Sequence, residues 1–217
     1  MESSEPTPVA AVGFEDSTHP TFEIGKPTDS DPWACLHNGD TTMRWLWIDR
    51  FLEFRRGQSA RAVKNLSMAE DLFADHFPGY PVMPAALILE GLAQTGGILV
   101  GEARDFKEKV VLAKIVSARF EREALAGETL VYDVAILTLR DEGASVQGRV
   151  HAFPGGAAIP KELPAQPMAE AEIFFAHLDQ ARSQQLFGDH NFVFSGELKH
   201  MLGLAKLVAE KESQPVS

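Results

Sequence analysis

Residues 76–97 have the sequence HFPGYPVMPAALILEGLAQTGG, and this stretch decides the fold. Its first six residues are unsuited to regular structure, because Pro78 and Pro81 lack amide donors and fix φ. Pro84 suits the first position of a helix, and the apolar residues after it predict a helix that ends between about residues 101 and 104. A single carboxylate, Glu90, stands in the middle of this helix. A buried glutamate is costly unless something uses it, so Glu90 is the first candidate functional residue.

The segments on either side of this helix have the composition and alternation of β-strands. Six strands are expected, at residues 44–54, 59–66, 109–122, 129–139, 145–153 and 168–178. A single helical turn is expected at residues 69–73, and the proline-rich residues 154–167 are expected to leave the sheet as an excursion. This order predicts the α+β class, with one long central helix wrapped by a curved antiparallel β-sheet.

The composition changes at both ends of the predicted domain, which we place at residues 43–178. Residues 1–42 are rich in Pro, Ser, Thr, Glu and Asp, and Lys26 is their only Lys or Arg. They predict an acidic tail that is partly disordered or strapped onto the domain. In residues 179–217, Ser195 suits the cap of a helix with one apolar face, which predicts a C-terminal helical extension.

The charge balance and the single cysteine limit the classes of function. The chain of 217 residues has 20 Lys and Arg against 31 Asp and Glu, so nucleic acid is not an expected partner. Cys35 cannot form an intrachain disulfide, which indicates a reducing compartment. The first residues lack the basic and apolar regions of a secretory signal, and the apolar stretch at residues 85–101 is short for a membrane span. We therefore expect a cytoplasmic protein without a membrane span.

Helical spacing gathers small and polar residues on one face of the predicted helix. That face contains Ala86, Glu90, Gln94 and Gly97, which are three or four positions apart. Apolar surroundings favour the protonated form of a carboxyl, because desolvation penalises its charge. Glu90 is therefore suited to act as a general acid.

His76 is the natural complement of Glu90. An imidazole titrates near neutral pH and is the usual general base. The first amides of the predicted helix, at Ala85 and Ala86, lack partners within it and can polarise a carbonyl oxygen. Together these groups suit removal of a proton next to a carbonyl and departure of a substituent from the following carbon.

A purely structural interpretation of the same residues stays open. His76 can cap a loop without a catalytic role, and Glu90 can pair with Arg119 or Gln94. The sequence contains no phosphate-binding, dinucleotide-binding or serine-hydrolase motif. The remaining histidines, among them His151 and His177, lack metal-ligand spacing, so no metal site is expected.

Three motifs carry a resemblance to a known family. They are His76-Phe77-Pro78-Gly79, Pro81-Val82-Met83-Pro84 and Glu90-Gly91-Leu92-Ala93-Gln94. Together with the spacing between the histidine and the glutamate, they closely resemble the 3-hydroxyacyl-[acyl-carrier-protein] dehydratases of the hot-dog fold. The resemblance covers about residues 45–178, and it is to the short branch with a catalytic glutamate rather than to the isomerising branch with aspartate.

The resemblance implies a reaction and a role for each site residue. The expected reaction is dehydration of (3R)-hydroxyacyl thioesters to trans-2-enoyl thioesters in fatty-acid or related lipid and polyketide biosynthesis. His76 is expected to be the base, and Glu90 of the other subunit the acid. Five residues are expected to bind substrate: Phe77, Gly79, Ala85, Ala86 and Gln94. Among them the Ala85 amide would hold the thioester carbonyl, and Gln94 would orient Glu90.

The resemblance also implies the partners of the chain. The substrate would be carried on the phosphopantetheine arm of acyl carrier protein or of CoA, and neither a metal nor a redox cofactor is implied. The chain is expected to form a homodimer, with a hexamer built as a trimer of dimers as the larger alternative. Two other functions stay open, which are a non-catalytic hot-dog module that binds acyl groups or dimerises, and a hot-dog acyl thioesterase.

Several positions differ from the family pattern. Ala85 stands where the family usually has glycine, and Tyr80 stands where histidine or arginine is frequent. Glu123 begins a pair that is commonly Arg-Pro in the family. Because acyl carrier proteins are acidic and a basic rim usually receives them, Glu121 and Glu123 predict a weaker basic rim in this chain.

Overall fold

The computed structural model describes residues 46–178 and residue 203. The predictions for the tail at residues 1–42 and for the helical extension at residues 179–217 lie outside these residues, apart from residue 203. The following description concerns residues 46–178.

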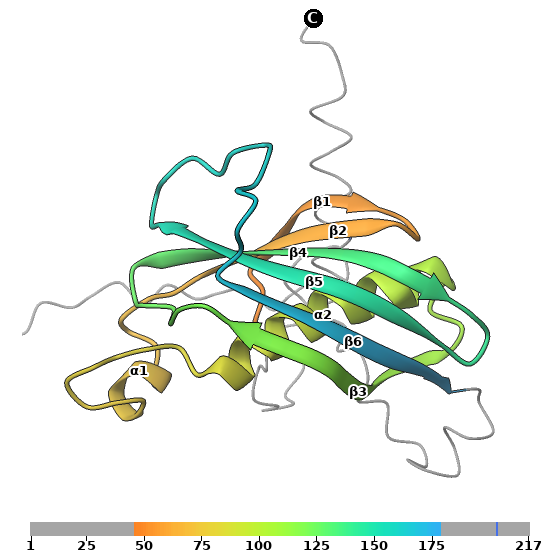
Figure 1. Ribbon diagram of the computed structural model, residues 1–217, viewed down its shortest axis with the longest axis horizontal. Coiled ribbons are helices and arrows are strands. Elements are labelled where there is room, and N and C mark those ends of the chain that lie inside the picture. The colour runs from red at the N-terminus through yellow and green to blue at the C-terminus, as the bar shows by residue number, and fades with distance from the viewer. Residues whose placement is uncertain (1–45, 179–202, 204–217) are drawn as a thin grey trace, which may run out of the picture. The chain divides into compact units, whose positions relative to one another are not determined.

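One six-stranded antiparallel sheet and one long helix make up the described fold (Figure 1). The strands are β1 (Arg50–Arg55), β2 (Ser59–Asn65), β3 (Lys109–Phe120), β4 (Glu128–Leu139), β5 (Gly143–Pro154) and β6 (Ala169–Leu178). The helices are α1 (Leu72–Asp75) and α2 (Ala85–Ala103). In space the strands follow the order β1-β2-β4-β5-β6-β3, and every neighbouring pair is antiparallel. The predicted α+β class is confirmed.

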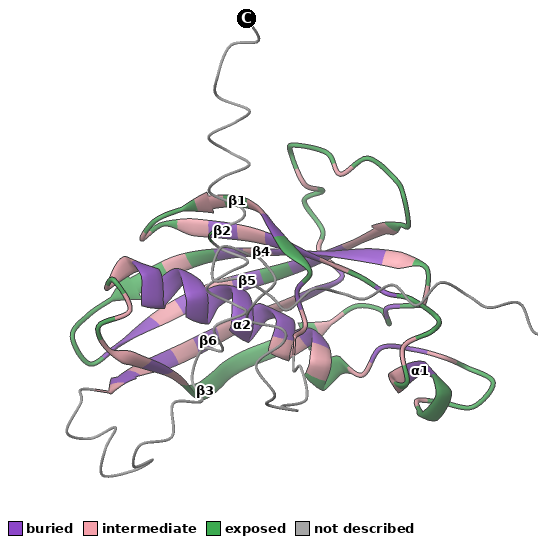
Figure 2. Cartoon of the chain, turned by 180° about the vertical axis from the view of Figure 1, so that it is seen from behind, coloured by how far each residue is buried: buried purple, intermediate pink, exposed green. Residues whose placement is uncertain are grey.

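The central helix α2 packs against strands β2 to β6. It begins at Ala85, with Pro84 as its N-cap, one residue later than predicted. Every residue from Gly91 to Glu102 is buried (Figure 2). A helix that is apolar on all sides is stable in water only when other elements enclose it. The predicted central helix is therefore confirmed.

The two faces of the sheet are clearest in β6 and β3. In β6 buried and half-buried residues alternate strictly, because successive side chains of a strand point to opposite faces. β3 differs, since its residues from Leu112 to Arg119 are all exposed. β3 is an edge strand and pairs only with β6 among the described strands.

The ends of several elements differ from the sequence prediction. The first strand begins at Arg50 instead of residue 44, because the Trp47 amide donates to the Gln94 side chain on α2 and not to a neighbouring strand. β3 ends at Phe120, two residues early, and α1 begins three residues later than the expected helical turn. The predicted excursion is confirmed, since residues 155–168 contain no helix or strand.

The excursion is held against the sheet by an arginine of β2. The Arg61 guanidinium donates to the Lys161 carbonyl at 3.1 Å, to Asp133 at 3.1 Å and to Glu53 at 3.0 Å. These contacts connect β1, β2 and β4 with the excursion. None of the helices in residues 46–178 is long and apolar enough to cross a membrane.

We expect Ile98→Ala to lower the free energy of unfolding by about 2–5 kcal/mol, because it leaves a cavity in a packed core. Ile98 lies in α2 and is fully buried. Leu137→Ala is the matched control, since Leu137 on β4 is 53% exposed and its truncation should cost about 0.5 kcal/mol or less. Urea unfolding measures both values, and equal losses would contradict the central place of α2.

Candidate active site

His76 lies at the C-terminal end of α1, in a loop that its own backbone closes. The His76 amide donates to the Leu72 carbonyl at 3.1 Å, and the Val82 amide donates to the His76 carbonyl at 2.9 Å. The ring atom Nδ1 lies 3.1 Å from the Val82 carbonyl oxygen. Because a carbonyl oxygen only accepts, Nδ1 must carry the hydrogen, and Nε2 of the neutral ring keeps its lone pair. The loop thus sets the tautomer that a general base needs.

Phe77 and Gly79 form the tight turn that follows the histidine. The amides and carbonyls of Phe77 and Tyr80 bond to each other at 3.0 and 2.9 Å. Gly79 has φ +83°, a backbone conformation that favours glycine. The peptide bond between His76 and Phe77 is cis, and their rings stack with centroids 4.1 Å apart. The Phe77 side chain is 54% exposed, so it is accessible to a ligand beside the histidine.

Glu90 lies one and a half turns into α2 and is half-buried. Its Oε1 accepts a hydrogen bond from Gln94 Nε2 at 3.0 Å. The Gln94 Oε1 in turn accepts the Trp47 amide at 2.9 Å, which fixes which end of the Gln94 amide faces the carboxyl. Gln94 is buried, so this chain of hydrogen bonds holds the carboxyl in one orientation.

Ala85 and Ala86 are the first two residues of α2, and both are exposed. Amides in the first turn of a helix have no acceptor within it, and they carry the positive end of the helix dipole. They can therefore donate to a carbonyl oxygen of a ligand. The loop that leads to them is anchored beside the sheet, because the Met83 amide donates to the Ala124 carbonyl at 2.8 Å.

Within the described residues, no hydrogen bond or ion pair joins His76 to Glu90. The structure also distinguishes the two residues that the sequence offered as partners of Glu90. Gln94 is its partner, whereas Arg119 bonds to Glu121 on the exposed side of β3. The prediction of a Glu90–Arg119 pair is therefore wrong within this chain, because Arg119 lies on the sheet edge and points to a different carboxylate.

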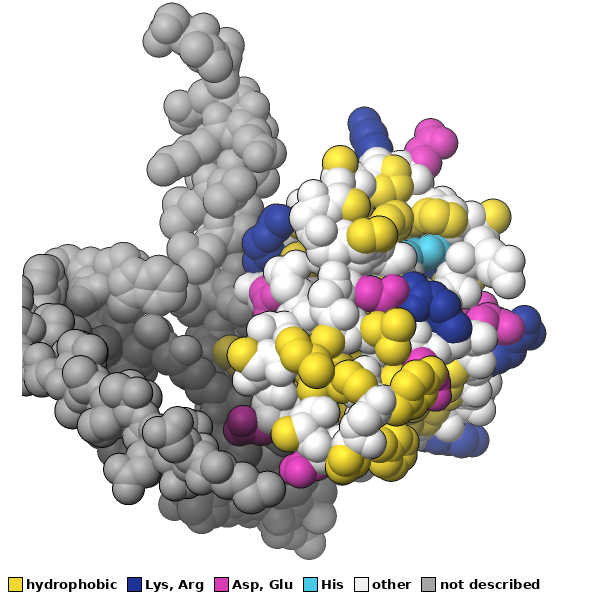
Figure 3. Space-filling view, turned by 90° about the vertical axis from the view of Figure 1, so that its left-hand side faces the viewer, with side chains coloured by type: hydrophobic (Ala, Val, Ile, Leu, Met, Phe, Trp, Pro, Cys, Tyr) yellow, Lys and Arg dark blue, Asp and Glu magenta, His cyan; other side chains and the backbone are white. Residues whose placement is uncertain are grey.

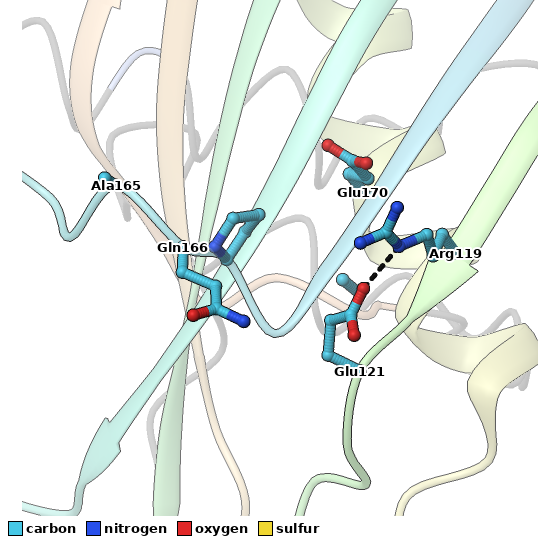
Figure 4. A pocket seen from close by; sticks show the side chains of 7 residues that line it. Arg119, Glu121, Ala165, Gln166 and Glu170 are labelled. Carbon is cyan, nitrogen blue, oxygen red and sulfur yellow. Dashed lines mark hydrogen bonds and ion pairs between the residues drawn. The ribbon is translucent and has the colours of Figure 1, made fainter.

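Two hollows lie beside the excursion, and neither contains a predicted site residue. One of about 360 Å³ lies between Arg119, Glu121, Glu170 and Gln166, where the dashed contact joins Arg119 to Glu121 (Figure 4). The neighbouring carboxylates of Glu121 and Glu170 raise the pKa of Arg119. A second hollow of about 340 Å³ is lined by His151, whose pKa burial lowers.

The end of the domain around α1 and the start of α2 combines exposed apolar side chains with paired charges (Figure 3). Arg122 makes a two-point contact with Glu128, at 2.9 and 3.1 Å. The Tyr80 hydroxyl donates to Glu123 at 2.6 Å, and this carboxylate raises the pKa of Tyr80. Arg122 at this end is thus paired with an acidic side chain of the same chain.

No group of three or more His, Cys, Asp or Glu side chains in the described part of the chain is arranged to hold a metal ion.

Sequence reasoning found Glu90 and Gln94 but missed the Trp47 amide that completes their hydrogen-bond chain. Trp47 is 47 positions from Gln94, and no sequence pattern links a backbone amide to a side chain at that distance.

A long helix packed on an antiparallel sheet, with a glutamate on the helix and a histidine in the loop before it, defines a hot-dog protein. Residues 41–160 match the FabA-like domain family. The chain belongs to this family, so the resemblance predicted from the sequence is confirmed.

Individual relatives agree with this assignment. The 3-hydroxyacyl-[acyl-carrier-protein] dehydratase FabZ of Koribacter versatilis is 39% identical over 112 residues, which are 51% of this chain and 70% of that protein. The FabZ dehydratase of Pelotomaculum thermopropionicum is 39% identical over 133 residues, 61% of this chain and 87% of its own length. A solved structure, the dehydratase heterocomplex ApeI:P of Xenorhabdus doucetiae, covers 67% of this chain and 91% of its own at TM-score 0.51 and 12% identity, which supports the fold alone.

We expect Gln94→Met to lower the free energy of unfolding by about 1–3 kcal/mol, because it removes the hydrogen bonds of a buried amide to Glu90 and Trp47 while keeping the side-chain length. Gln147→Met is the matched control, since Gln147 on β5 is only partly buried and its bonds are long, at 3.3 and 3.4 Å. Chemical unfolding of both variants tests this difference. Equal stability of the Gln94 variant and the parent would show that the chain of hydrogen bonds adds nothing.

Proposed function

We propose that this protein dehydrates (3R)-hydroxyacyl thioesters to trans-2-enoyl thioesters in fatty-acid or related lipid biosynthesis. Two contacts carry the proposal. His76 Nδ1 donates a hydrogen bond to the Val82 carbonyl, and Gln94 holds the Glu90 carboxyl in one orientation. The family and the FabZ relatives support the same reaction.

The proposed chemistry divides between three groups. His76 Nε2 removes a proton from the carbon next to the thioester carbonyl. The Ala85 amide donates to that carbonyl oxygen, which gains negative charge as the proton leaves. Glu90, in its protonated form, gives a proton to the departing hydroxyl group, so that water leaves and a double bond forms. The glutamate ends as a carboxylate and the histidine as an imidazolium, and proton exchange with water restores both.

We propose that the two groups meet across a homodimer, His76 from one subunit and Glu90 from its partner. Within one chain, His76 is held by the Val82 carbonyl and Glu90 by Gln94, with no bond between the two residues, which supports this arrangement. The exposed edge β3 supports it further, because Leu112, Ile115 and Val116 are each more than 40% exposed there. An unpaired apolar edge readily pairs with another strand, and a second copy of β3 would cover it. A hexamer built as a trimer of dimers is the larger assembly of the same proposal.

The proposed substrate reaches the site on a phosphopantetheine arm, of acyl carrier protein or of CoA. The FabZ relatives are 3-hydroxyacyl-[acyl-carrier-protein] dehydratases, which supports the carrier protein. The exposed Phe77 and the turn at Gly79 lie next to His76 and suit contact with the arm. Ala86 and Gln94 lie one helical turn before and after Glu90 on α2. The protein's own residues then perform the reaction without a bound metal or redox group.

His76→Ala and Glu90→Gln should each lower kcat for hydration of an enoyl thioester by about 10²–10⁴-fold, the usual contribution of an acid or base. The mixed dimer of the two variants, isolated through two different affinity tags, sharpens the test. One of its two sites then has both residues intact, so it should recover about half of the parental activity.

Four outcomes would contradict parts of this proposal. Parental turnover in both single variants would exclude the acid–base roles. A mixed dimer as inactive as its parents would place both residues of a site in one subunit. Release of free thiol from a saturated acyl thioester, without hydration of the enoyl thioester, would favour a thioesterase, and binding without either reaction would favour a non-catalytic module.

The dimer can be tested at the edge strand. Ile115→Lys should convert the dimer to monomer at micromolar concentration and lower activity with it, because lysine on an exposed edge opposes strand pairing. Leu137→Lys is the control, since Leu137 is 53% exposed, against 41% for Ile115, but lies on β4 inside the sheet. Sedimentation velocity distinguishes the states, and an unchanged Ile115 variant would exclude the β3 edge as the interface.

A further inference from the structure

The residue after Glu90 is a glycine that leaves room for a ring of the sheet. Tyr132 of β4 is fully buried and lies against α2 at Gly91. A Cβ at position 91 would be 2.3 Å from the Tyr132 Cζ, 2.5 Å from its hydroxyl oxygen and 2.8 Å from its Cε1. Because real Cβ atoms do not approach other heavy atoms so closely, the ring occupies the space that any side chain at position 91 would need.

At the next helical residue, Leu92, the side chain belongs to the helix and the glycine that makes room for it belongs to the sheet. Leu92 is buried and lies against Gly148 of β5, where a Cβ would be 2.7 Å from the Leu92 Cδ2. Tyr132 pairs with Val150, and Gly148 pairs with Val134, so the two contacts lie on neighbouring strands. At Gly91 the helix makes room for the sheet, and at Leu92 the sheet makes room for the helix.

Two contacts of opposite sense restrict a helix more than one contact does. A ring in a notch of the helix resists sliding of the helix along its axis, and a leucine in a notch of the sheet resists rotation about that axis. Close-packed interiors transmit such constraints, because they have little free volume. Glu90 is covalently next to Gly91, so the same contacts fix where its Cα lies relative to the sheet.

The Tyr132 ring, rather than its hydroxyl, provides the fit. The hydroxyl oxygen is buried and has no hydrogen-bond partner among the described residues, and burial raises the pKa of the group. A hydroxyl without a partner does not stabilise the folded state. The stabilising part of the contact is therefore the shape of the ring against Gly91.

We propose that Gly91 with Tyr132, and Leu92 with Gly148, are positioning residues that place the Glu90 carboxyl for proton transfer. The proposal rests on the role of Glu90 as the acid in the proposed function. It assigns no contact with substrate to these four residues. It predicts that kcat is sensitive to a single methyl group at position 91.

The first comparison is between two glycine substitutions in the same helix. Gly91→Ala should lower kcat by about 10-fold or more, since small displacements of a catalytic group are costly, with KM changed less than about 3-fold. Gly96→Ala is the matched control, because a Cβ there would be 3.2 Å from Phe175 Cε2 and Val146 Cγ2, a tight contact that a shift of a few tenths of an ångström relieves, whereas the Cβ at position 91 would be 2.3 Å from the Tyr132 ring. Its kcat and KM should stay those of the parent.

The second comparison restores the space. In Gly91→Ala/Tyr132→Leu the shortened side chain leaves room for the added methyl, and kcat should return toward that of Tyr132→Leu alone. Tyr132→Phe should keep the parental kcat, because it removes only the unpartnered hydroxyl. If Gly91→Ala lowered kcat only through a general loss of stability, the double variant should not recover activity, because both of its changes lie in the core.

The proposal is overturned if Gly91→Ala has the kcat of the parent, or if Tyr132→Phe loses activity. It is also overturned if the double variant folds but its kcat stays below that of Tyr132→Leu alone. Should Gly91→Ala fail to fold, the double variant carries the test, and a folded but inactive double variant overturns it. Glu90→Gln separates the two proposals. If that variant keeps full activity, the proposed function fails, whereas an inactive Glu90→Gln beside an active Gly91→Ala overturns only the positioning.

Discussion

The hydrogen bond from Gln94 to Glu90 is the interaction on which the site depends. A carboxyl on a largely buried helix is costly to hold unless its position is set and a neighbour satisfies it. Gln94 satisfies Glu90 because the Trp47 amide fixes the opposite end of its side chain. The segment before β1 is therefore part of the support of the site, through the backbone of Trp47.

The sheet serves this helix in two ways. Its inner face encloses α2 from Gly91 to Glu102, which lets so apolar a helix form in water. Its connection at Ala124 and Leu125 holds the loop between His76 and α2 close to the start of the helix. The histidine thereby acquires a defined tautomer from its own loop rather than from another catalytic group.

Much of this architecture could be predicted from local sequence. The prolines around Pro84 and the largely apolar residues after it predicted α2 to within a residue at its start, because helix initiation depends on adjacent residues. The i to i+4 spacing of Glu90 and Gln94 predicted their contact for the same reason. The start of β1 was wrong, because a contact with α2 replaces pairing at Trp47. Between Arg119 and Gln94 as partners of Glu90 the sequence could not decide, since sequence gives no distance between a helix and a sheet edge.

The sequence by itself determined the class of the fold, the place of the central helix and the identity of the two candidate catalytic residues. All three follow from residues that are neighbours in the chain, for which backbone geometry sets the spatial relation. Only the tertiary structure decided what lies against that helix. The fit of Tyr132 into Gly91 and of Leu92 into Gly148 joins residues far apart in sequence. Such contacts depend on strand order and register, which the packing of the whole sheet fixes.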